Sequence, residues 1–200
     1  MKKNFFNLVI ISNLIFGQIS IESSPKSFIS NRNFDIPEII LPNINIEQII
    51  EQERLEQQSN QRKPYKFAET ISVNLNMNNA GTWTTLEDGS SVWQLKITSY
   101  DAYSLNLIYD TFHIPSGAEF FLYSEDRTMV IGAFTDFNHK PHGGFSTAPV
   151  KGDNIILEYN EPATVQFRGN ISMSIVAHDY RNVFFNDNRG YGDSGSCNNN

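Results

Sequence analysis

The stretch GYGDSGSC, from Gly190 to Cys197, contains the GDSG pattern that surrounds the nucleophile of trypsin-like serine proteases. Its glycines would let the backbone bend and place N–H groups around an oxyanion. A catalytic Ser194 would also need a histidine base, a carboxylate behind that base, and chain on both sides to build a substrate pocket. Only six residues follow Ser194. We therefore interpret GDSG as an imitation of the motif and expect no catalytic residue in this chain.

The upstream histidines do not supply the missing base. His178 and Asp179 are neighbours in a predicted strand, so their side chains leave on opposite faces and cannot form a base and carboxylate pair. His113 lies just before Pro115 and has no compelling carboxylate partner. A rival hypothesis is that the chain is a small hydrolase with Ser194 as its nucleophile. Labelling of the chain by a serine-reactive probe would support it.

Two kinds of loop could bind metal ions. His139 and His142 form an H-x-x-H pattern with Asp136 as the only obvious third ligand. The pattern spans a glycine-rich loop without cysteine, so a solvated loop is favoured over a metal site. The acidic loops SEDRT (124–128) and PVKGDN (149–154) each lack the several oxygen ligands that Ca²⁺ requires. We expect no metal and no cofactor.

Four aromatic residues, Trp83, Trp93, Tyr100 and Tyr103, could stack on a sugar ring. Alternation places Trp93 and Tyr103 in the core, which leaves Trp83 and Tyr100, nearer strand ends, as the candidate surface platform. The alternative hypothesis is therefore a stand-alone extracellular binding module for carbohydrate or a cell surface. A glycan signal lost on Trp83→Ala would favour it.

The chain of 200 residues is 40% apolar and 12% aromatic, which is enough for one domain with a core and an additional segment. Its formal net charge of −7 argues against nucleic acid and anionic membrane surfaces as partners, because both need basic patches on the protein.

The first 18 residues, MKKNFFNLVIISNLIFGQ, are typical of a secretory signal peptide. Two lysines precede an apolar stretch from Phe5 to Phe16, which is shorter than the roughly 20 residues of a membrane span. We expect cleavage between Gln18 and Ile19. This predicts a protein that is secreted or at the cell surface, exported through the periplasm, with no membrane association after the signal is removed.

Cys197 is the single cysteine of the sequence. Cysteines of exported proteins usually form pairs. Cys197 is either free or intermolecular, or its partner belongs to sequence that follows this fragment; we favour the second reading because Cys197 lies so close to the end.

Residues 19–68 lack strand alternation and are rich in Asn, Ser, Gln, Glu and Pro, which predicts an extended arm. Within the arm, Asn45 and Gln48 form a capping-box arrangement, so we expect a short amphipathic helix over about 45–57. Its apolar stripe of Ile46, Ile49 and Ile50 is too short to stabilise it alone, and we expect the helix to dock on another surface.

From residue 69 the hydrophobic period changes to two, beginning with Ile71, Val73 and Leu75. Eight or nine short strands follow up to residue 181, with a predicted hairpin turn at Asp88-Gly89 and no helix between them. We predict an all-β, antiparallel, jelly-roll-like sandwich over 69–181. Asn170-Ile171-Ser172 matches a glycosylation acceptor, which we interpret as ordinary strand alternation. Residues 182–200 are predicted to be a flexible linker.

Four segments occur in a fixed order along the chain: GTWTTLEDGSSVWQLKITSYDAYSLNLIYDTFHIPSGAEFFLYSEDRTMVIGAFT, GGFSTAPVKGDNIILEY, SIVAHDYRN and GDSGSCNNN. Together they closely resemble the amino-terminal pro-region of secreted lysyl-endopeptidase-like serine proteases of Bacteroidetes-type bacteria. The resemblance covers about residues 19–200 and departs only at Asn199 and Asn200, where an aliphatic residue is more usual.

This resemblance implies a proenzyme fragment that ends at the start of the trypsin-like domain. In that family the catalytic residues lie downstream of this pattern, and the SGSCN cysteine pairs with a later one, which would account for Cys197. The implied partner is the downstream protease domain, which the pro-region would restrain or help to fold. Arg189-Gly190 is the expected processing bond, since it lies in a glycine-containing linker. Arg181 and Lys151 are lesser candidates.

Overall fold

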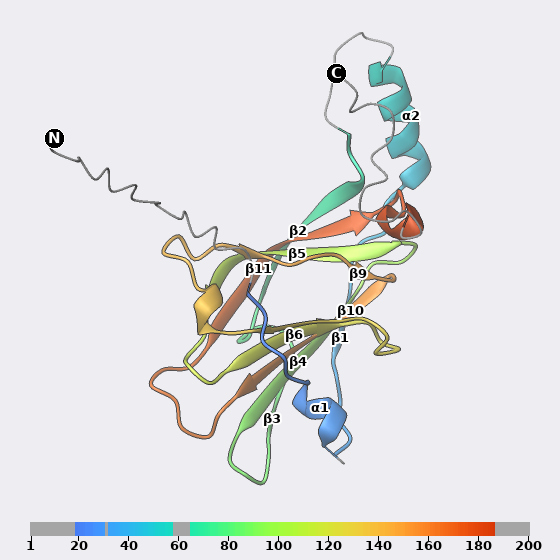
Figure 1. Ribbon diagram of the computed structural model, residues 1–200. Coiled ribbons are helices and arrows are strands. Elements are labelled where there is room, and N and C mark those ends of the chain that lie inside the picture. The colour runs from blue at the N-terminus through green and yellow to red at the C-terminus, as the bar shows by residue number, and fades with distance from the viewer. Residues whose placement is uncertain (1–18, 31, 58–64, 187–200) are drawn as a thin grey trace, which may run out of the picture.

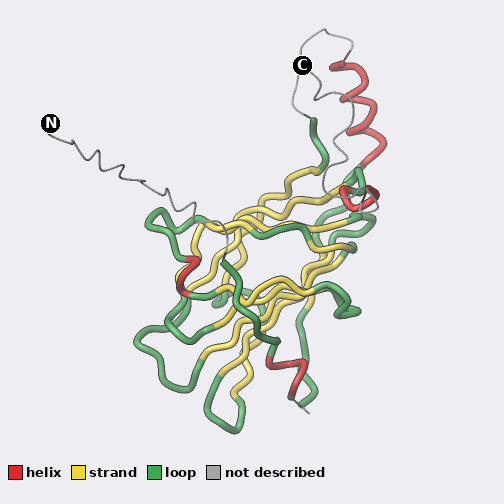
Figure 2. The backbone as a smooth tube through the Cα atoms, viewed as in Figure 1, coloured by secondary structure: helices red, strands yellow, loops and turns green. Residues whose placement is uncertain are grey.

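The computed structural model describes residues 19–30, 32–57 and 65–186, which form two β-sheets packed face to face (Figure 1). Two short α-helices accompany the sheets in this part of the chain, α1 (Lys26–Ile29) and α2 (Ile46–Gln57). Two single-turn 3-10 helices are η1 (Asp136–Asn138) and η2 (Val183–Asn186). Figure 2 shows that strands, connected by loops, account for much more of the described backbone than helices do. The predicted all-β sandwich is confirmed.

The two sheets divide the described strands between them. Sheet A contains β1 (Glu38–Ile40), β3 (Thr82–Thr85), β4 (Ser91–Thr98), β6 (Glu119–Tyr123), β7 (Val130–Phe134) and β10 (Asn154–Glu161). Sheet B contains β2 (Ala68–Asn76), β5 (Ser104–His113), β8 (Phe145–Ser146), β9 (Val150–Lys151) and β11 (Asn170–Asp179). Apart from the edge strands β1, β3 and β9, the orders are β4-β10-β6-β7 and β2-β11-β5-β8. Antiparallel pairing in this order is jelly-roll topology.

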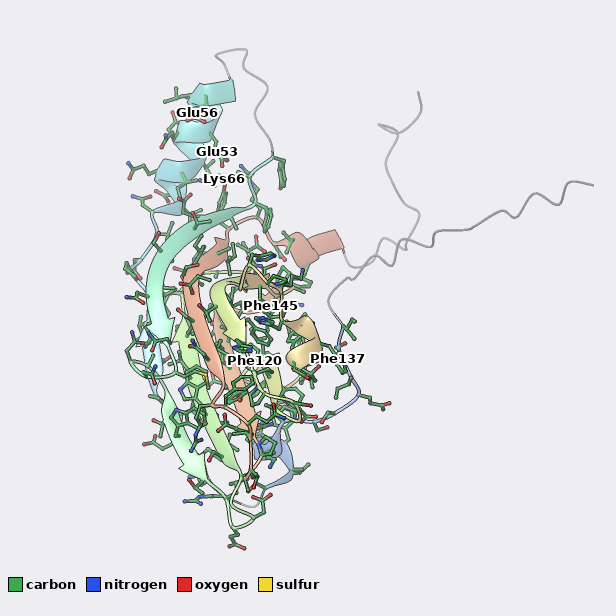
Figure 3. The ribbon with its side chains drawn as sticks, turned by 90° about the vertical axis from the view of Figure 1, so that its left-hand side faces the viewer. Glu53, Glu56, Lys66, Phe120, Phe137 and Phe145 are labelled. Atoms are coloured by element: carbon green, nitrogen blue, oxygen red, sulfur yellow. The ribbon has the colours of Figure 1, made fainter. Side chains whose placement is uncertain are left out.

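Alternating side chains fill the space between the sheets. Trp93 is fully buried as predicted, and the Phe112 and Phe145 rings stack with their centroids 4.4 Å apart. Tyr109 meets Phe120 edge to face at 5.8 Å. Figure 3 shows Phe120 and Phe145 inside the sandwich. These aromatic contacts make the core rigid, because each ring is held by several others.

The predicted hairpin turn at Asp88-Gly89 is confirmed. It joins β3 to β4, where the Leu86 N–H donates to the Ser90 carbonyl at 2.8 Å. Gly89 has a φ of 78°, which glycine adopts without steric cost, and the Asp88 carboxylate accepts from the Ser90 N–H at 2.9 Å.

Residues 19–41 do not stand apart from the sandwich, although the sequence pattern places the start of the sandwich at residue 69. β1 pairs in parallel with β4, so that Ile39 lies opposite Ile97. The Ile21 and Ala133 backbones exchange two hydrogen bonds of 3.2 Å. The arm therefore covers the outer face of sheet A.

A buried carboxylate binds the arm to the sheet. Glu158 lies on the outer face of β10 and is fully buried. It accepts from the Ser27 N–H at 3.1 Å, the Ser27 hydroxyl at 2.5 Å, the Tyr123 hydroxyl at 2.9 Å and the Gln94 amide at 3.0 Å. Burial raises the pKa of the Tyr123 hydroxyl, so that group stays a donor. Beside this network, Phe28 packs edge to face on Tyr123.

The helix α2 matches the predicted range and begins as predicted, because the Asn45 side-chain oxygen accepts from the Gln48 N–H at 3.0 Å. Figure 1 shows that α2 projects from one end of the sandwich instead of lying on a sheet. Ile50 and Leu55 on this helix are exposed. Of the predicted apolar stripe, Ile46 and Ile49 are half-buried and only Ile50 is exposed.

Different turns lie at the two ends of the sandwich. One end, which we call the exit end, contains the turns 99–103, 124–129 and 151–153 and the last residues of β11. Hydrogen bonds connect these turns, from the Tyr103 N–H to the Asp179 carbonyl and from the Gly152 N–H to the Tyr103 carbonyl, both 2.9 Å. The opposite, or far, end contains the turns 77–81, 114–118 and 162–169.

Candidate functional site

Exposed aromatic side chains gather at the exit end. Tyr65 is 76% exposed, Tyr100 49% and Tyr103 50%, and Phe67 and Val183 are exposed beside them. The position of Tyr103 contradicts the prediction that it lies in the core. β5 begins only at Ser104, so Tyr103 belongs to the preceding turn and the alternation of the strand does not direct its side chain.

Polar contacts connect the second half of α2 to this end. Glu53 accepts hydrogen bonds from the Tyr180 hydroxyl and the Arg181 guanidinium, and Tyr180 also donates to the Lys66 carbonyl at 3.2 Å. Figure 3 shows Glu53 and Lys66 at this junction. The bond from Tyr180 lowers the pKa of Glu53, while burial and the carboxylate raise the pKa of Tyr180 to about 12. The orientation of α2 relative to the sandwich is therefore fixed by the hydrogen bonds of the Glu53 carboxylate with Tyr180 and Arg181.

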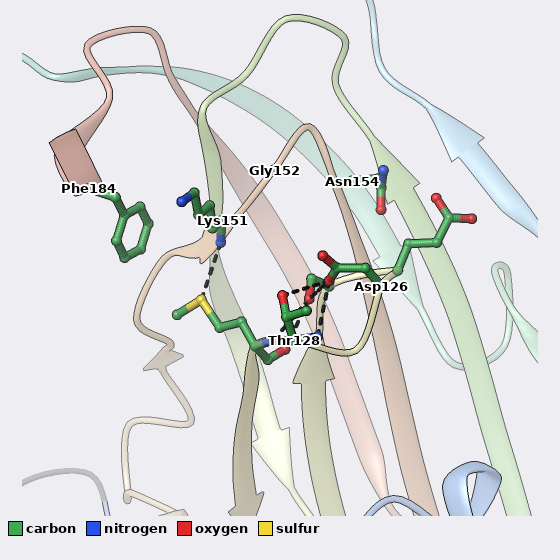
Figure 4. A pocket seen from close by; sticks show the side chains of 9 residues that line it. Asp126, Thr128, Lys151, Gly152, Asn154 and Phe184 are labelled. Atoms are coloured by element: carbon green, nitrogen blue, oxygen red, sulfur yellow. Dashed lines mark hydrogen bonds between the residues drawn. The ribbon is translucent and has the colours of Figure 1, made fainter. Parts of the chain in front are cut away.

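A surface pocket of about 780 Å³ opens between two turns of the exit end (Figure 4). Its lining includes Asp126 and Thr128 from the β6–β7 turn, Lys151 from β9 and Phe184 from η2. The Asp126 carboxylate is occupied locally, because it accepts from the Ser124 and Thr128 hydroxyls at 2.6 and 2.8 Å. Phe184 therefore lies beside the two acidic loops 124–128 and 149–154, near the last described residue, 186.

His178 and Asp179 have separate partners, as the sequence predicts. His178 Nδ1 lies 2.8 Å from Ser99 Oγ, and Asp179 accepts from the Ser104 hydroxyl at 2.8 Å. Asp179 also accepts from the Arg181 and Val183 N–H groups, so it fixes the chain where β11 ends. Both side chains are buried. This Ser–His pair was not predicted, and its burial keeps it from any substrate.

The two predicted members of an aromatic platform lie at opposite ends of the molecule. Trp83 pairs with Trp93 near the start of β4, at the far end, whereas Tyr100 follows the end of β4 at the exit end. Both are exposed. A single platform formed by both residues is excluded, and each must be considered with its own neighbours.

The histidine loop has no metal-site geometry. His139 Nδ1 lies 3.0 Å from the Phe112 carbonyl, and His142 Nδ1 accepts from the Gly144 N–H at 3.0 Å. His113 stacks on Phe167 with ring centroids 4.4 Å apart. Within residues 19–30, 32–57 and 65–186 no group of three His, Cys, Asp or Glu side chains could hold a metal ion.

Two further details concern the strands. Around Asn170, exposed and half-buried side chains flank the buried Ile171, which is the predicted alternation. Glu158 and Glu161 on β10 are both buried, Glu158 on the outer face of the strand and Glu161 on the same face as the core residues Leu157 and Tyr159. The partners of Glu158 come from segments far away in the sequence, whereas those of Glu161 are Tyr159, Arg168 and Gly169 from the same strand and the turn after it.

Several predicted residues lie outside the described part of the chain. These are the signal segment with Gln18, the processing bond Arg189-Gly190, Ser194 and Cys197. Of the two lesser cleavage candidates, Arg181 donates a hydrogen bond to Glu53, and Lys151 lies in β9, where it pairs with Ser104 of β5.

In the described residues no helix has the length and apolar character that crossing a membrane requires. No family model matches the chain, and no solved structure matches it.

Proposed function

We propose that this chain is the non-catalytic pro-region of a secreted serine endopeptidase, which binds the peptidase domain that follows it through the exit end. The observation that carries the proposal is the cluster of exposed Tyr65, Phe67, Tyr100, Tyr103 and Val183 where the described chain leaves the sandwich.

The chemistry of this cluster is that of a protein interface. Tyrosine and phenylalanine are enriched where proteins bind each other, since they bury a large area at a small cost in side-chain entropy. Charged groups surround the cluster, including Glu53, Arg181 and Lys151. An apolar centre with a polar rim is the usual composition of such a surface.

Binding at the exit end would explain both roles of a pro-region. A domain that binds only the folded form of its partner shifts the folding equilibrium towards that form. The same contact would restrain the peptidase until the connecting chain is cut. Arg181 and Lys151 are held by hydrogen bonds, so we propose Arg189-Gly190 as the processing bond.

The proposal is tested on the secreted precursor and its mature peptidase. We expect the mature N-terminus between residues 187 and 197. The double variant Tyr100→Ser/Tyr103→Ser should weaken binding of the purified pro-region to the mature peptidase by about 10-fold or more, because interface tyrosines contribute about 1–2 kcal/mol each.

Phe137→Ser is the control, because Phe137 is an aromatic residue that is even more exposed than Tyr100 and Tyr103 but lies in η1, next to the far end (Figure 3). Its binding should equal that of the wild type. A reading frame without a peptidase domain after residue 200 would refute the proposal, as would unchanged binding of the double variant.

A further inference from the structure

We propose that the far end carries a carbohydrate-binding subsite, built around Trp83 and Arg168, for a neutral pyranose residue of a glycan. A pocket of about 350 Å³ lies here, lined by Met77, Asn78, Trp83, Thr85, Ser91, Arg168 and Gly169. Its size is within the range of small-ligand sites, about 300–1,000 Å³. This inference does not rest on the proposed pro-region function.

The indole ring of Trp83 is exposed but fixed in orientation. It is 38% exposed, its Nε1–H donates to the Met77 carbonyl at 3.2 Å, and its ring meets Tyr159 edge to face at 5.9 Å. β3 is an edge strand that pairs with β4, so one side of Trp83 faces the end of the core. A fixed aromatic surface binds a sugar ring without loss of side-chain entropy.

Arg168 is held beside this ring by a buried acid. Its guanidinium Nη1 donates to Glu161 Oε1 at 2.5 Å, and the guanidinium carbon lies 5.9 Å from the Trp83 ring centroid. Glu161 has a side chain that is 1% exposed and also accepts from the Tyr159 hydroxyl and the Gly169 N–H, both at 2.9 Å. The Arg168 side chain itself is 74% exposed. Its remaining N–H donors therefore face solvent from a fixed position.

Charge selects the class of ligand. The positive charge of Arg168 is balanced by Glu161, so the pocket has no excess cation to bind a phosphate or sulfate. Its other polar groups are the Asn78 amide and the Thr85 and Ser91 hydroxyls. Neutral donors and acceptors around an aromatic face suit the hydroxyls and the C–H face of a pyranose.

The location leaves the subsite accessible. Trp83 and Arg168 lie at the far end, whereas Tyr100 and Tyr103 lie at the exit end. A protein that covers the exit end would not reach this pocket. The chain could therefore hold a glycan and a protein partner at the same time.

The test uses NMR of the secreted chain with cellohexaose, laminarihexaose, mannohexaose and xylohexaose, each to about 10 mM, which detects millimolar Kd values. The sequence has two tryptophans, so the spectrum contains two indole N–H signals, and Trp83→Phe assigns them. We expect at least one sugar to shift the Trp83 signal and to leave the signal of the buried Trp93 in place.

Variants decide which residues bind. Trp83→Ala should weaken calorimetric binding at least about 10-fold and Arg168→Ala about 5-fold, while Trp83→Phe keeps part of it. Tyr100→Ala and Phe137→Ala, which remove exposed aromatic rings elsewhere, should bind as the wild type does. If Trp83→Ala fails to fold, the sugar affinity of Arg168→Ala tests the subsite instead.

Three results would overturn the proposal. The first is the absence of a Trp83 shift with all four sugars, and the second is binding that Arg168→Ala leaves unchanged. The third is a shift of the Trp83 signal by a nucleotide or a tyrosine-containing peptide, but by none of the sugars, since the pocket would then serve a different class of ligand.

Discussion

Single residues in this chain show how burial changes chemistry. His178 forms a hydrogen bond with Ser99, and its Nε2 atom is buried without a hydrogen-bond partner. Burial lowers the pKa of His178, although the nearby Asp179 and Asp101 partly offset this effect. The side chain therefore stays neutral in the folded protein at a pH where an unfolded chain takes up a proton.

The stability of the protein should consequently fall as the solution is acidified. Because the folded pKa of His178 lies below the unfolded value of about 6.5, the unfolded chain binds more protons as the pH drops from about 7.5 to 5. In His178→Asn, whose amide can replace Nδ1, the free energy of unfolding should depend less steeply on pH over this range. Urea unfolding at several pH values measures the slope.

The exposed His142 provides the control for this experiment. His142→Asn replaces a histidine whose side chain is exposed to solvent, and so controls for the loss of an imidazole elsewhere in the chain. Equal slopes for the wild type and His178→Asn would show that burial of His178 does not couple protonation to folding.

At the scale of elements, local signals predicted the helix α2 and the strands of the sandwich but missed α1 and β1 in the arm, and they did not predict what each element contacts. The Asn45 cap and the apolar positions after it correctly predict α2. The helix is nevertheless held by Glu53, on the polar side of the pattern, through Tyr180 and Arg181. These partners lie more than 120 residues away in the sequence, so no local pattern could identify them.

Removing this contact should release α2 without unfolding the sandwich. In Glu53→Ala we expect amide hydrogen exchange over residues 46–57 to become about 5–10-fold faster, because charge-assisted hydrogen bonds are lost. The strands should exchange as in the wild type. Exchange measured by mass spectrometry compares these segments directly.

Glu51→Ala is the matched variant for this element. Glu51 is exposed and pairs with Arg54 one turn along the same helix, so its loss should change exchange very little. If Glu51→Ala and Glu53→Ala accelerate exchange equally, the orientation of α2 does not depend on the contact with Tyr180 and Arg181.

For the whole molecule, the arm over residues 19–41 acts as a third layer. Its contacts explain why both faces of β4 are buried, with Trp93 and Leu95 towards the core and Val92 and Gln94 towards the arm. Polar residues on a strand face are compatible with water or with a polar protein partner. The sequence pattern is the same in both cases, which is why the arm was expected to lie apart.

The arm and the sandwich should therefore unfold together. Glu158→Gln places an amide N–H₂ among groups that donate to the carboxylate, and we expect it to lower the free energy of unfolding by about 2–4 kcal/mol. Ser27→Ala should act in the same direction, by about 1–2 kcal/mol. Urea denaturation of a chain that begins at residue 19 measures both.

Glu119→Gln serves as the reference, because Glu119 accepts from the Ser23 hydroxyl at an exposed position, and its effect should stay within about 0.5 kcal/mol. Equal stability of Glu158→Gln and Glu119→Gln would mean that the arm does not belong to the cooperative unit.

The amino-acid sequence by itself determined the strands after residue 68, the hairpin at Asp88-Gly89, the helix cap at Asn45 and the sandwich class, because these follow from interactions among residues a few positions apart. Only the tertiary structure decided that Tyr103 is exposed, that Trp83 is separated from Tyr100, and that Glu161 holds Arg168 beside Trp83. Such placements depend on which turns meet at each end of the sandwich. Contacts between segments far apart in the chain leave no periodic signal in the sequence.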